Sequence, residues 1–214
     1  MIIKVCCINS IAEAQMAVNH GASALGLVGP MPSGPGIISI TKAAEITAAF
    51  NQLVNTFYLT SKTSLDEILQ EYDTVLSTHI QLTDYTSAQL RKDLKSHRPE
   101  LKIVQVVHVS DQNSVDTAKS LSQFSDYLLL DSGSPNKNIK ELGGTGRVHN
   151  WGISKKIVEV SNIPVFLAGG LNHENVSEAI GIVRPFGVDL CSGLRTEYKL
   201  DPIKIKAFFK SLKS

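Results

Sequence analysis

The chain of 214 residues contains little that would tie it to a membrane, a nucleic acid or an oxidising compartment. Its three cysteines, Cys6, Cys7 and Cys191, are an odd number with an adjacent pair, which is a poor disulfide framework and favours a reducing cytosol. The net charge is only +1, without a run of like charges, so neither nucleic acid nor an anionic membrane is expected as a partner.

Long hydrophobic runs are absent as well. No apolar stretch approaches the roughly 20 residues that span a bilayer, and segment 1–8 is too short and too β-branched for a signal peptide. No spacing of cysteine and histidine resembles a zinc site, so no metal is expected. With 43% hydrophobic and 19% charged residues, the sequence is typical of a globular protein, and we expect residues 1–214 to form a single cytoplasmic domain.

Short β-branched apolar runs recur along the whole chain, and each is followed by a segment with helix signals. Several of these runs are continuously apolar, which is typical of parallel strands buried on both faces. Eight strands are predicted, at residues 2–8, 24–29, 55–60, 79–82, 103–109, 127–131, 164–168 and 187–191.

Capping residues divide the intervening segments into helices. Asn9 or Ser10 can cap a first helix that ends near residue 20, and Ser64 with Glu67 three residues later has the pattern of a capping box. The other helices are predicted within 39–50, 86–95, 113–123, 154–160, 173–182 and 202–212. Eight strands alternating with eight helices predict an α/β fold, a (β/α)8 TIM barrel, rather than a doubly wound open sheet.

Glycines follow the last two predicted strands. Barrels of this kind carry their chemistry at the carboxyl ends of the strands and frequently bind phosphate after strands seven and eight. Gly169 and Gly170 follow strand seven, and Ser192 and Gly193 follow strand eight. Glycines allow backbone amides to approach an anion, and a helix starting near residue 172 would add favourable partial charge.

A third glycine-rich loop follows strand six and contains Gly143, Gly144 and Thr145, with Arg147 close behind. It can wrap a ligand and offer further amides. Each loop alone is explained equally well by a tight turn. Three such loops at consecutive strand ends together predict a phosphate-bearing ligand.

Cys6 is the candidate base. Because side chains alternate along a strand, Lys4 and Cys6 share one face, and Cys7 would face the helix layer as a small buried hydrophobe. If Lys4 and Cys6 point into the barrel, the positive neighbour would lower the pKa of the thiol and suit it to accept a proton. The alternative is that Cys6 too is only a buried hydrophobe.

Asp131 is the candidate acid, since it ends the apolar strand 127–131 and so lies in the catalytic ring of a barrel. Its alternative role is to cap the following loop. Asp189 could bind a ribose hydroxyl or pair with Lys4. The remaining notable residues are expected to be satisfied core groups, namely His79, Gln81 and His108, or helix packing, namely Trp151.

These residues resemble the phosphoribosylanthranilate isomerase family along essentially the whole chain. Lys4-Val5-Cys6 is similar to the family's Lys-Ile-Cys-Gly opening, and Gln81-Leu82 to the start of its Gln-Leu-His-Gly. The more specific matches are Leu129-Leu130-Asp131-Ser132, Gly143-Gly144-Thr145-Gly146 with Trp151, Leu167-Ala168-Gly169-Gly170-Leu171, and Val188-Asp189 with Ser192-Gly193.

The resemblance implies an Amadori rearrangement, aldose to ketose, in tryptophan biosynthesis, on a phosphorylated sugar and with no metal or organic cofactor. Cys6 matches the family's general base, which acts on the sugar C2 proton. Asp131 matches its general acid, which acts on the ring oxygen. Relatives occur as monomers and as homodimers, and the sequence does not favour either state.

The chain departs from the family at the aglycone end of the site. Cys7 replaces a glycine, Thr83 replaces the histidine of Gln-Leu-His-Gly, and Arg195 replaces a glutamate. Gly36 stands where the family has an arginine that binds the anthranilate carboxylate, a contact worth roughly 1.5–3 kcal/mol.

Three functions are therefore open. The first is the isomerase itself, with Arg195 or Arg147 replacing the missing arginine. The second is an isomerase or epimerase acting on another phosphosugar, and the third is a catalytically silent phosphosugar-binding protein. The presence of both Cys6 and Asp131 argues against silence, because binding alone requires neither a thiol nor an acid.

Overall fold

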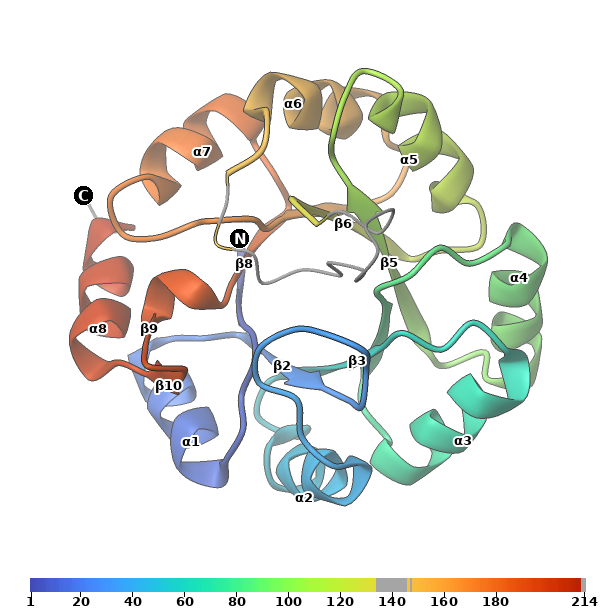
Figure 1. The fold of residues 1–214 in the computed structure, drawn as a ribbon, viewed down its shortest axis with the longest axis horizontal. Coiled ribbons are helices and arrows are strands. Elements are labelled where there is room, and N and C mark those ends of the chain that lie inside the picture. The colour runs from blue at the N-terminus through green and yellow to red at the C-terminus, as the bar shows by residue number, and fades with distance from the viewer. Residues whose placement is uncertain (134–145, 147, 213–214) are drawn as a thin grey trace.

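The computed structural model describes residues 1–133, 146 and 148–212. In this part of the chain eight parallel strands close into one barrel in sequence order, with β1 beside both β2 and β8 (Figure 1). The strands are β1 (Ile2–Val5), β2 (Ala24–Val28), β3 (Asn55–Thr60), β4 (His79–Leu82), β5 (Lys102–His108), β6 (Tyr127–Asp131), β7 (Val165–Leu167) and β8 (Gly187–Leu190). The predicted (β/α)8 barrel is confirmed.

Helices alternate with the strands and surround the barrel (Figure 1). They are α1 (Ile11–His20), α2 (Ile40–Phe50), α3 (Leu65–Val75), α4 (Ala88–His97), α5 (Ser114–Ser122), α6 (Trp151–Val160), α7 (Val176–Val183) and α8 (Pro202–Ser211). No helix in the described ranges is long and apolar enough to cross a bilayer.

Side-chain capping explains where several helices begin. Ser10 Oγ accepts from the Glu13 backbone N–H at 3.2 Å, as predicted for α1. Asn150 Oδ1 accepts from the Gly152 N–H at 2.9 Å, so α6 begins three residues earlier than predicted. The capping box at Ser64 is wrong, because its hydroxyl donates to Glu67 Oε2 at 2.7 Å and caps no backbone N–H.

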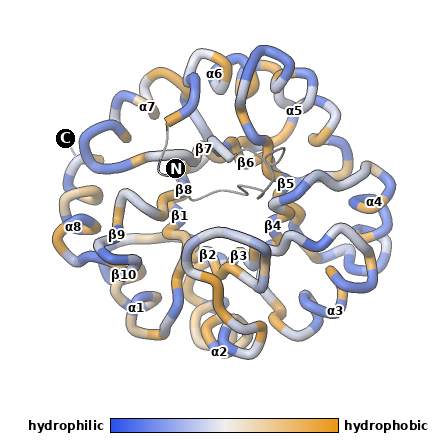
Figure 2. The backbone as a smooth tube through the Cα atoms, viewed as in Figure 1, coloured by the Kyte–Doolittle hydropathy of each residue, from blue (hydrophilic) through white to orange (hydrophobic). Residues whose placement is uncertain are grey.

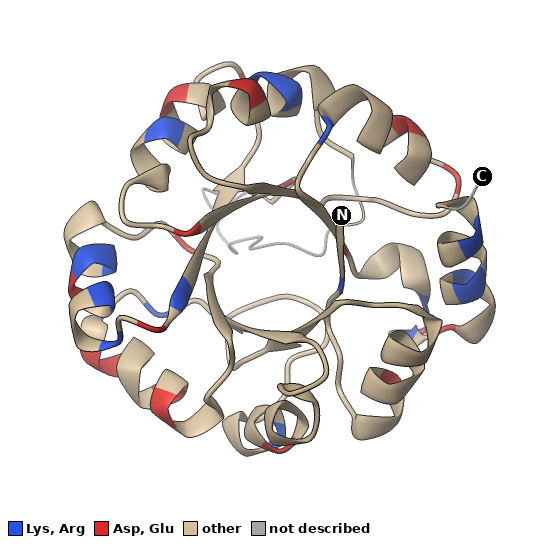
Figure 3. Ribbon diagram, turned by 180° about the vertical axis from the view of Figure 1, so that it is seen from behind, with Lys and Arg blue, Asp and Glu red and all other residues tan. Residues whose placement is uncertain are grey.

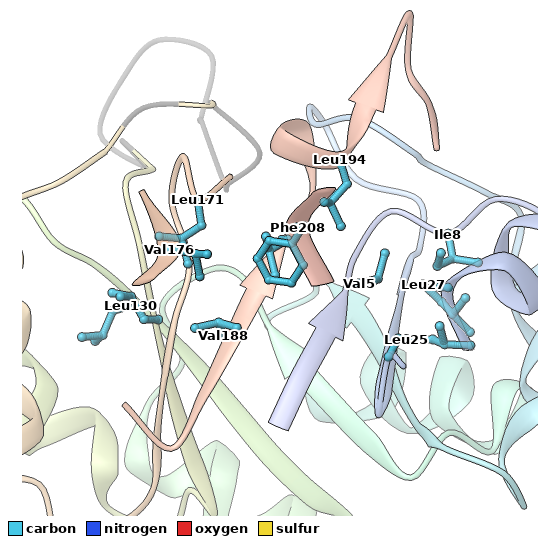
Figure 4. Packing of buried hydrophobic residues seen from close by; sticks show 14 of the residues in the cluster. Val5, Ile8, Leu25, Leu27, Leu130, Leu171, Val176, Val188, Leu194 and Phe208 are labelled. Carbon is cyan, nitrogen blue, oxygen red and sulfur yellow. The ribbon is translucent and has the colours of Figure 1, made fainter. Parts of the chain in front are cut away.

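The main hydrophobic core lies between the strands and the helices. Figure 4 shows Val5 and Leu25 from two neighbouring strands, with Val176 and Phe208 from α7 and α8, among the buried side chains of this layer. Hydrophobic residues concentrate along the strands (Figure 2), and most charged residues lie on the outer helices (Figure 3). Trp151 packs against this core, as predicted.

Aromatic rings fill the amino-terminal half of the barrel interior. The His79 ring stacks on Phe57 with centroids 4.2 Å apart, and Tyr127 and Phe166 complete the layer. Thr78 Oγ1 lies 2.8 Å from His79 Nδ1, so His79 is the satisfied core group that was predicted. These rings occupy the end of the barrel opposite to the carboxyl ends of the strands.

The segment between β8 and α8 was not predicted. It contains a short 3-10 turn, η1 (Ser192–Leu194), and a two-stranded hairpin, β9 (Arg195–Thr196) and β10 (Lys199–Leu200). Glu197 and Tyr198 form its turn with φ of 48° and 64°, as a two-residue hairpin turn requires. The hairpin lies beside α1 and α8 (Figure 1).

Candidate active site

A cavity opens at the carboxyl ends of the strands and has about 630 Å³ of empty space, including the part open to solvent. Both predicted catalytic residues, Cys6 after β1 and Asp131 at the end of β6, line it although they come from well-separated strands. The structure therefore brings the candidate base and the candidate acid to one cavity.

Cys6 is buried and sits against Lys4 inside the barrel. A Cβ added to Gly26 of β2 would lie 2.6 Å from Cys6 Sγ and 2.9 Å from Lys4 Nζ, so this glycine provides the space for both groups. The predicted inward orientation of Lys4 and Cys6 is thus confirmed. Only a residue without a side chain fits at position 26 while the thiol and the ammonium occupy this face.

The predicted direction of the Cys6 pKa is wrong. Burial, followed by the charge of Asp189, raises the pKa of the thiol to about 11, against the lowering effect of the Lys4 ammonium. Desolvation wins because the thiol is buried at the base of the cavity. The resting thiol is therefore protonated at neutral pH, and Lys4 is the cation that favours the thiolate.

Asp131 is buried at the end of β6, and its Oδ1 accepts from the Ser132 N–H at 2.7 Å. Burial raises the pKa of this carboxyl, the Ser132 hydrogen bond and the charge of His108 lower it, and Asp189 raises it. A raised pKa lets a carboxyl retain its proton, which is what a general acid requires. The local hydrogen bond also shows that the acid and loop-capping roles are compatible.

Asp189 forms a buried ion pair with Lys4, with Nζ and Oδ2 2.9 Å apart. Its other oxygen, Oδ1, has no hydrogen-bond partner within the described protein, and the residue lines the cavity. Both predicted roles of Asp189 are therefore compatible, because one oxygen holds Lys4 and the other remains for a ligand hydroxyl.

Gln81 belongs to the site, contrary to prediction. Its side chain lines the cavity, is buried, and has an Oε1 without a hydrogen-bond partner within the described residues. A buried amide oxygen without a partner is costly, so a ligand hydroxyl or N–H is a suitable donor for it. The only sequence signal for this role was the match of Gln81-Leu82 to the family motif.

Cys7 and Cys191 form a disulfide with a Cα–Cα distance of 6.0 Å, so the expectation of no disulfide is wrong for this pair. The expected place of Cys7 in the helix layer is wrong too, because β1 ends at Val5 and strand alternation does not continue. Cys7 has a φ of 63°, which turns its side chain to the cavity wall. Cys6 is the free cysteine.

The disulfide predicts a countable thiol content. Protein kept under oxidising conditions is expected to expose one alkylatable thiol after denaturation, Cys6, and reduced protein three. Intact mass after denaturing alkylation, with and without prior reduction, measures this count. Three modified thiols in the air-oxidised sample would contradict the pairing.

Gly36 packs directly against Cys7. A Cβ at Gly36 would lie 2.6 Å from Cys7 Cβ and 2.9 Å from Cys7 Cα, and the φ of Gly36 is +74°. An arginine side chain therefore has no room at position 36, because its Cβ would already meet both the backbone and the Cβ of Cys7. The neighbouring residues Met31, Ser33 and Pro35 line the cavity instead.

Gly169, Gly170 and Ser192 line the other end of the cavity, where the phosphate was predicted. The two glycines have φ of 82° and 65°, which are left-handed values that glycine adopts without strain. Gly193 is not in the lining, but its missing side chain matters: a Cβ there would lie 2.0 Å from the Leu171 carbonyl oxygen.

Helix α7 begins at Val176, later than predicted. Asn172 Oδ1 accepts from the Glu174 N–H at 2.8 Å, and this turn precedes the helix. The predicted contribution of a helix starting at residue 172 is therefore wrong. Gly143, Gly144, Thr145 and Arg147 lie outside the described residues.

Replacing Gly193 by alanine should weaken binding at this end of the site. The added methyl would push the segment after β8 away from Leu171, and we expect affinity for inorganic phosphate and for phosphosugars to fall by about tenfold or more. Crystals soaked in phosphate should show an anion near Gly170 and Ser192 in the wild type. Gly181, whose Cβ would meet nothing within 4 Å, provides the matched glycine-to-alanine control.

Arg195 does not replace the missing arginine. It is buried behind the cavity wall in an ion pair with Glu13, with Nη1 and Oε1 3.0 Å apart. The suggestion that it binds a ligand carboxylate is therefore wrong. The residue that succeeds the family's histidine, Thr83, lines the cavity.

The model of the N-(5'-phosphoribosyl)anthranilate isomerase family matches residues 3–211. The chain belongs to this family. Isomerase 2 of Methanosarcina mazei is 35% identical over 204 residues, which are 91% of this chain and 86% of the relative.

Solved structures of this family have the same barrel. The isomerase of Thermotoga maritima is 29% identical and superposes with a TM-score of 0.85, over 100% of this chain and 99% of the other. A family structure in complex with reduced 1-(o-carboxyphenylamino)-1-deoxyribulose 5-phosphate is 26% identical with a TM-score of 0.82, over 100% and 99% of the two chains.

Proposed function

We propose that this family member rearranges phosphoribosylanthranilate from aldose to ketose, with Cys6 as general base and Asp131 as general acid. The observation that carries the proposal is that one cavity holds both residues together with a glycine-lined end suited to phosphate. Family membership supports the reaction, and the sequence around Cys6 and Asp131 resembles the motifs that carry the family's base and acid.

The phosphate group lies against Gly169, Gly170 and Ser192 and fixes the ribose above the barrel. Gly143, Gly144, Thr145 and Gly193 are proposed to complete this end. Asp189 Oδ1 and Gln81 Oε1 accept hydrogen bonds from ribose hydroxyls, because neither atom has a hydrogen-bond partner among the described residues.

Asp131 starts the reaction by giving its proton to the ribose ring oxygen. The C1–O bond then breaks, the ring opens, and a protonated Schiff base remains at C1. Burial raises the pKa of the Asp131 carboxyl and so favours its protonated form, which a general acid requires.

The Cys6 thiol first loses its proton to solvent, and the thiolate then removes the proton from C2, which gives an enolamine and a neutral thiol. Protonation at C1 together with loss of the C2 hydroxyl proton gives the ketose, so substrate and product are isomers and no redox partner or cofactor is used. The Lys4 ammonium beside Cys6 offsets the charge of the thiolate and is itself held by Asp189.

A specific observation favours a second candidate, an isomerase acting on another N-substituted phosphosugar. The cavity-lining residues at the aglycone end are uncharged in the described part of the chain, and Gly36, which stands at the position of the family's arginine, packs directly against Cys7. Arg147 remains the candidate cation for an anthranilate carboxylate under the first proposal.

We place the enzyme in the cytosol as a single barrel domain of residues 1–214, working as a monomer or homodimer. Its substrate is a phosphorylated small molecule. A reducing cytosol favours the thiol forms of Cys7 and Cys191 over their disulfide.

Growth of a tryptophan auxotroph that lacks this isomerase tests the proposal. Expression of the wild-type chain should restore growth without tryptophan, and an equally expressed Asp131→Asn variant should not. Failure of the folded wild-type protein to restore growth, together with turnover of another phosphosugar, would establish the second candidate instead.

A further inference from the structure

Arg195 holds the backbone at the candidate base. Its Nη2 donates to the carbonyl oxygens of Cys6 at 3.1 Å and Cys7 at 2.6 Å, and its Nη1 donates to the Tyr198 carbonyl at 3.0 Å. The side chain is 5% exposed. A buried guanidinium thus reaches from β9 to the two residues that follow β1.

These carbonyls lie beyond the barrel's regular hydrogen bonding. The β1 ladder ends at Val5, which pairs with Leu25 and Leu190. The Cys6 N–H donates to the Leu190 carbonyl at 2.7 Å. With Arg195 on the carbonyl side, both backbone polar groups of Cys6 are held, one by β8 and one by the guanidinium.

Glu13 fixes the guanidinium in turn. Its carboxylate accepts from Arg195 Nη1 at 3.0 Å and from the Leu200 N–H of β10 at 2.8 Å. It also accepts from the Asn9 N–H at 3.3 Å, on the turn between β1 and α1. Because its hydrogen bonds come from three segments, the pair joins the hairpin to the turn that carries the thiol.

The figures agree with this placement. Figure 4 shows Val5, immediately before Cys6, on the strand beside the segment that carries Leu194, immediately before Arg195. Figure 1 shows the hairpin of β9 and β10 next to α1, where Glu13 lies.

We propose that Arg195 is a positioning residue for Cys6, acting with Glu13 and the β9–β10 hairpin to set the direction of the thiol at the cavity. This inference rests on the proposed function, in which Cys6 is the base. The planar fork can hold two carbonyls and a carboxylate at once, which the single ammonium of a lysine cannot do in the same geometry. The expected consequence is slower proton removal with substrate binding retained.

Kinetics of matched arginine variants test this role. Arg195→Met is compared with Arg91→Met, which removes another buried arginine that donates to backbone carbonyls, those of Ser120 and Gln123, away from Cys6. We expect Arg195→Met to lower kcat by about 100-fold, the cost of a misplacement of about 1 Å. The Kd of the reduced product analogue should stay within about threefold.

The control and the conservative variants separate positioning from general stability. Arg91→Met should lose thermal stability but keep kcat within about threefold, while Arg195→Lys should recover part of the lost kcat. Equal kcat for Arg195→Met and Arg91→Met would overturn the proposal. If Arg195→Met does not fold, Glu13→Gln, which keeps the shape but loses the charge, is measured with the same criteria.

A second readout is independent of turnover. In a Cys7→Ser, Cys191→Ser background Cys6 is the only thiol, and Arg195→Met should change its rate of alkylation by iodoacetamide by about fivefold or more, against less than twofold for Arg91→Met. If the wild type does not turn over phosphoribosylanthranilate, the proposed function fails. The alkylation ratio then decides the positioning role by itself, and equal rates would overturn it.

Discussion

Replacing Cys6 by serine should lower kcat for phosphoribosylanthranilate by about 10³-fold, within the 10²–10⁴ range that general acid–base catalysis contributes. A serine hydroxyl fills nearly the same space against Gly26 and Lys4, so the fold is retained. It ionises far less readily than a thiol, so the base that takes the C2 proton is lost. Substrate affinity should change little, because phosphate and hydroxyl contacts come from other residues.

The measurement is the fluorescence change that accompanies loss of phosphoribosylanthranilate, with thermal melting as the folding check. Cys7→Ser is the neighbouring control, and its kcat should fall by less than about tenfold. The wild-type thiol should also show its raised pKa of about 11 as an alkylation rate that climbs with pH from 7 to 10. Turnover by Cys6→Ser close to that of the wild type would exclude Cys6 as the base.

Replacing Asp131 by asparagine should lower kcat by a similar factor, about 10³-fold. The amide oxygen can still accept from the Ser132 N–H, which lies 2.7 Å from Oδ1 in the wild type. The amide cannot release a proton to the ring oxygen, so ring opening loses its acid. The substitution thus retains the hydrogen bond to Ser132 and removes the proton donor.

The same substitution should not reduce stability at neutral pH. Because burial raises the pKa of Asp131, the folded state favours the protonated carboxyl, and its contribution to stability is lost as pH rises through the folded pKa. A neutral amide does not ionise, so Asp131→Asn should melt at the same temperature or higher at pH 7 and above. A variant that melts normally but keeps more than a tenth of the wild-type kcat would exclude Asp131 as the acid.

The sequence allowed the barrel and the location of the candidate base and acid at one cavity to be predicted, because both depend on local patterns. Alternation along β1 placed Lys4 and Cys6 inside, and an apolar run ending in a carboxylate placed Asp131 at the mouth. The strand-end glycines predicted a phosphate end, and two of them, Gly169 and Gly170, line the cavity.

The errors came from contacts between distant segments. Cys7 and Cys191 are 184 residues apart in sequence, and their pairing depends on how β1 ends beside β8. The pKa of Cys6 depends on burial, on the charge of Asp189 and on the charge of Lys4 together. The presence of Lys4 in the sequence alone does not decide whether that pKa is raised or lowered. The sequence does not reveal that Arg195 pairs with Glu13, because the two residues are 182 positions apart. Without that partner, the prediction that Arg195 binds a ligand carboxylate was wrong.

The most direct test of the central claim is the rate of phosphoribosylanthranilate loss with purified wild-type protein, run beside Cys6→Ser and Asp131→Asn. The account predicts turnover by the wild type and its loss in both variants, with all three proteins folded. No turnover by folded wild type that still binds inorganic phosphate, or equal turnover by all three, would contradict it.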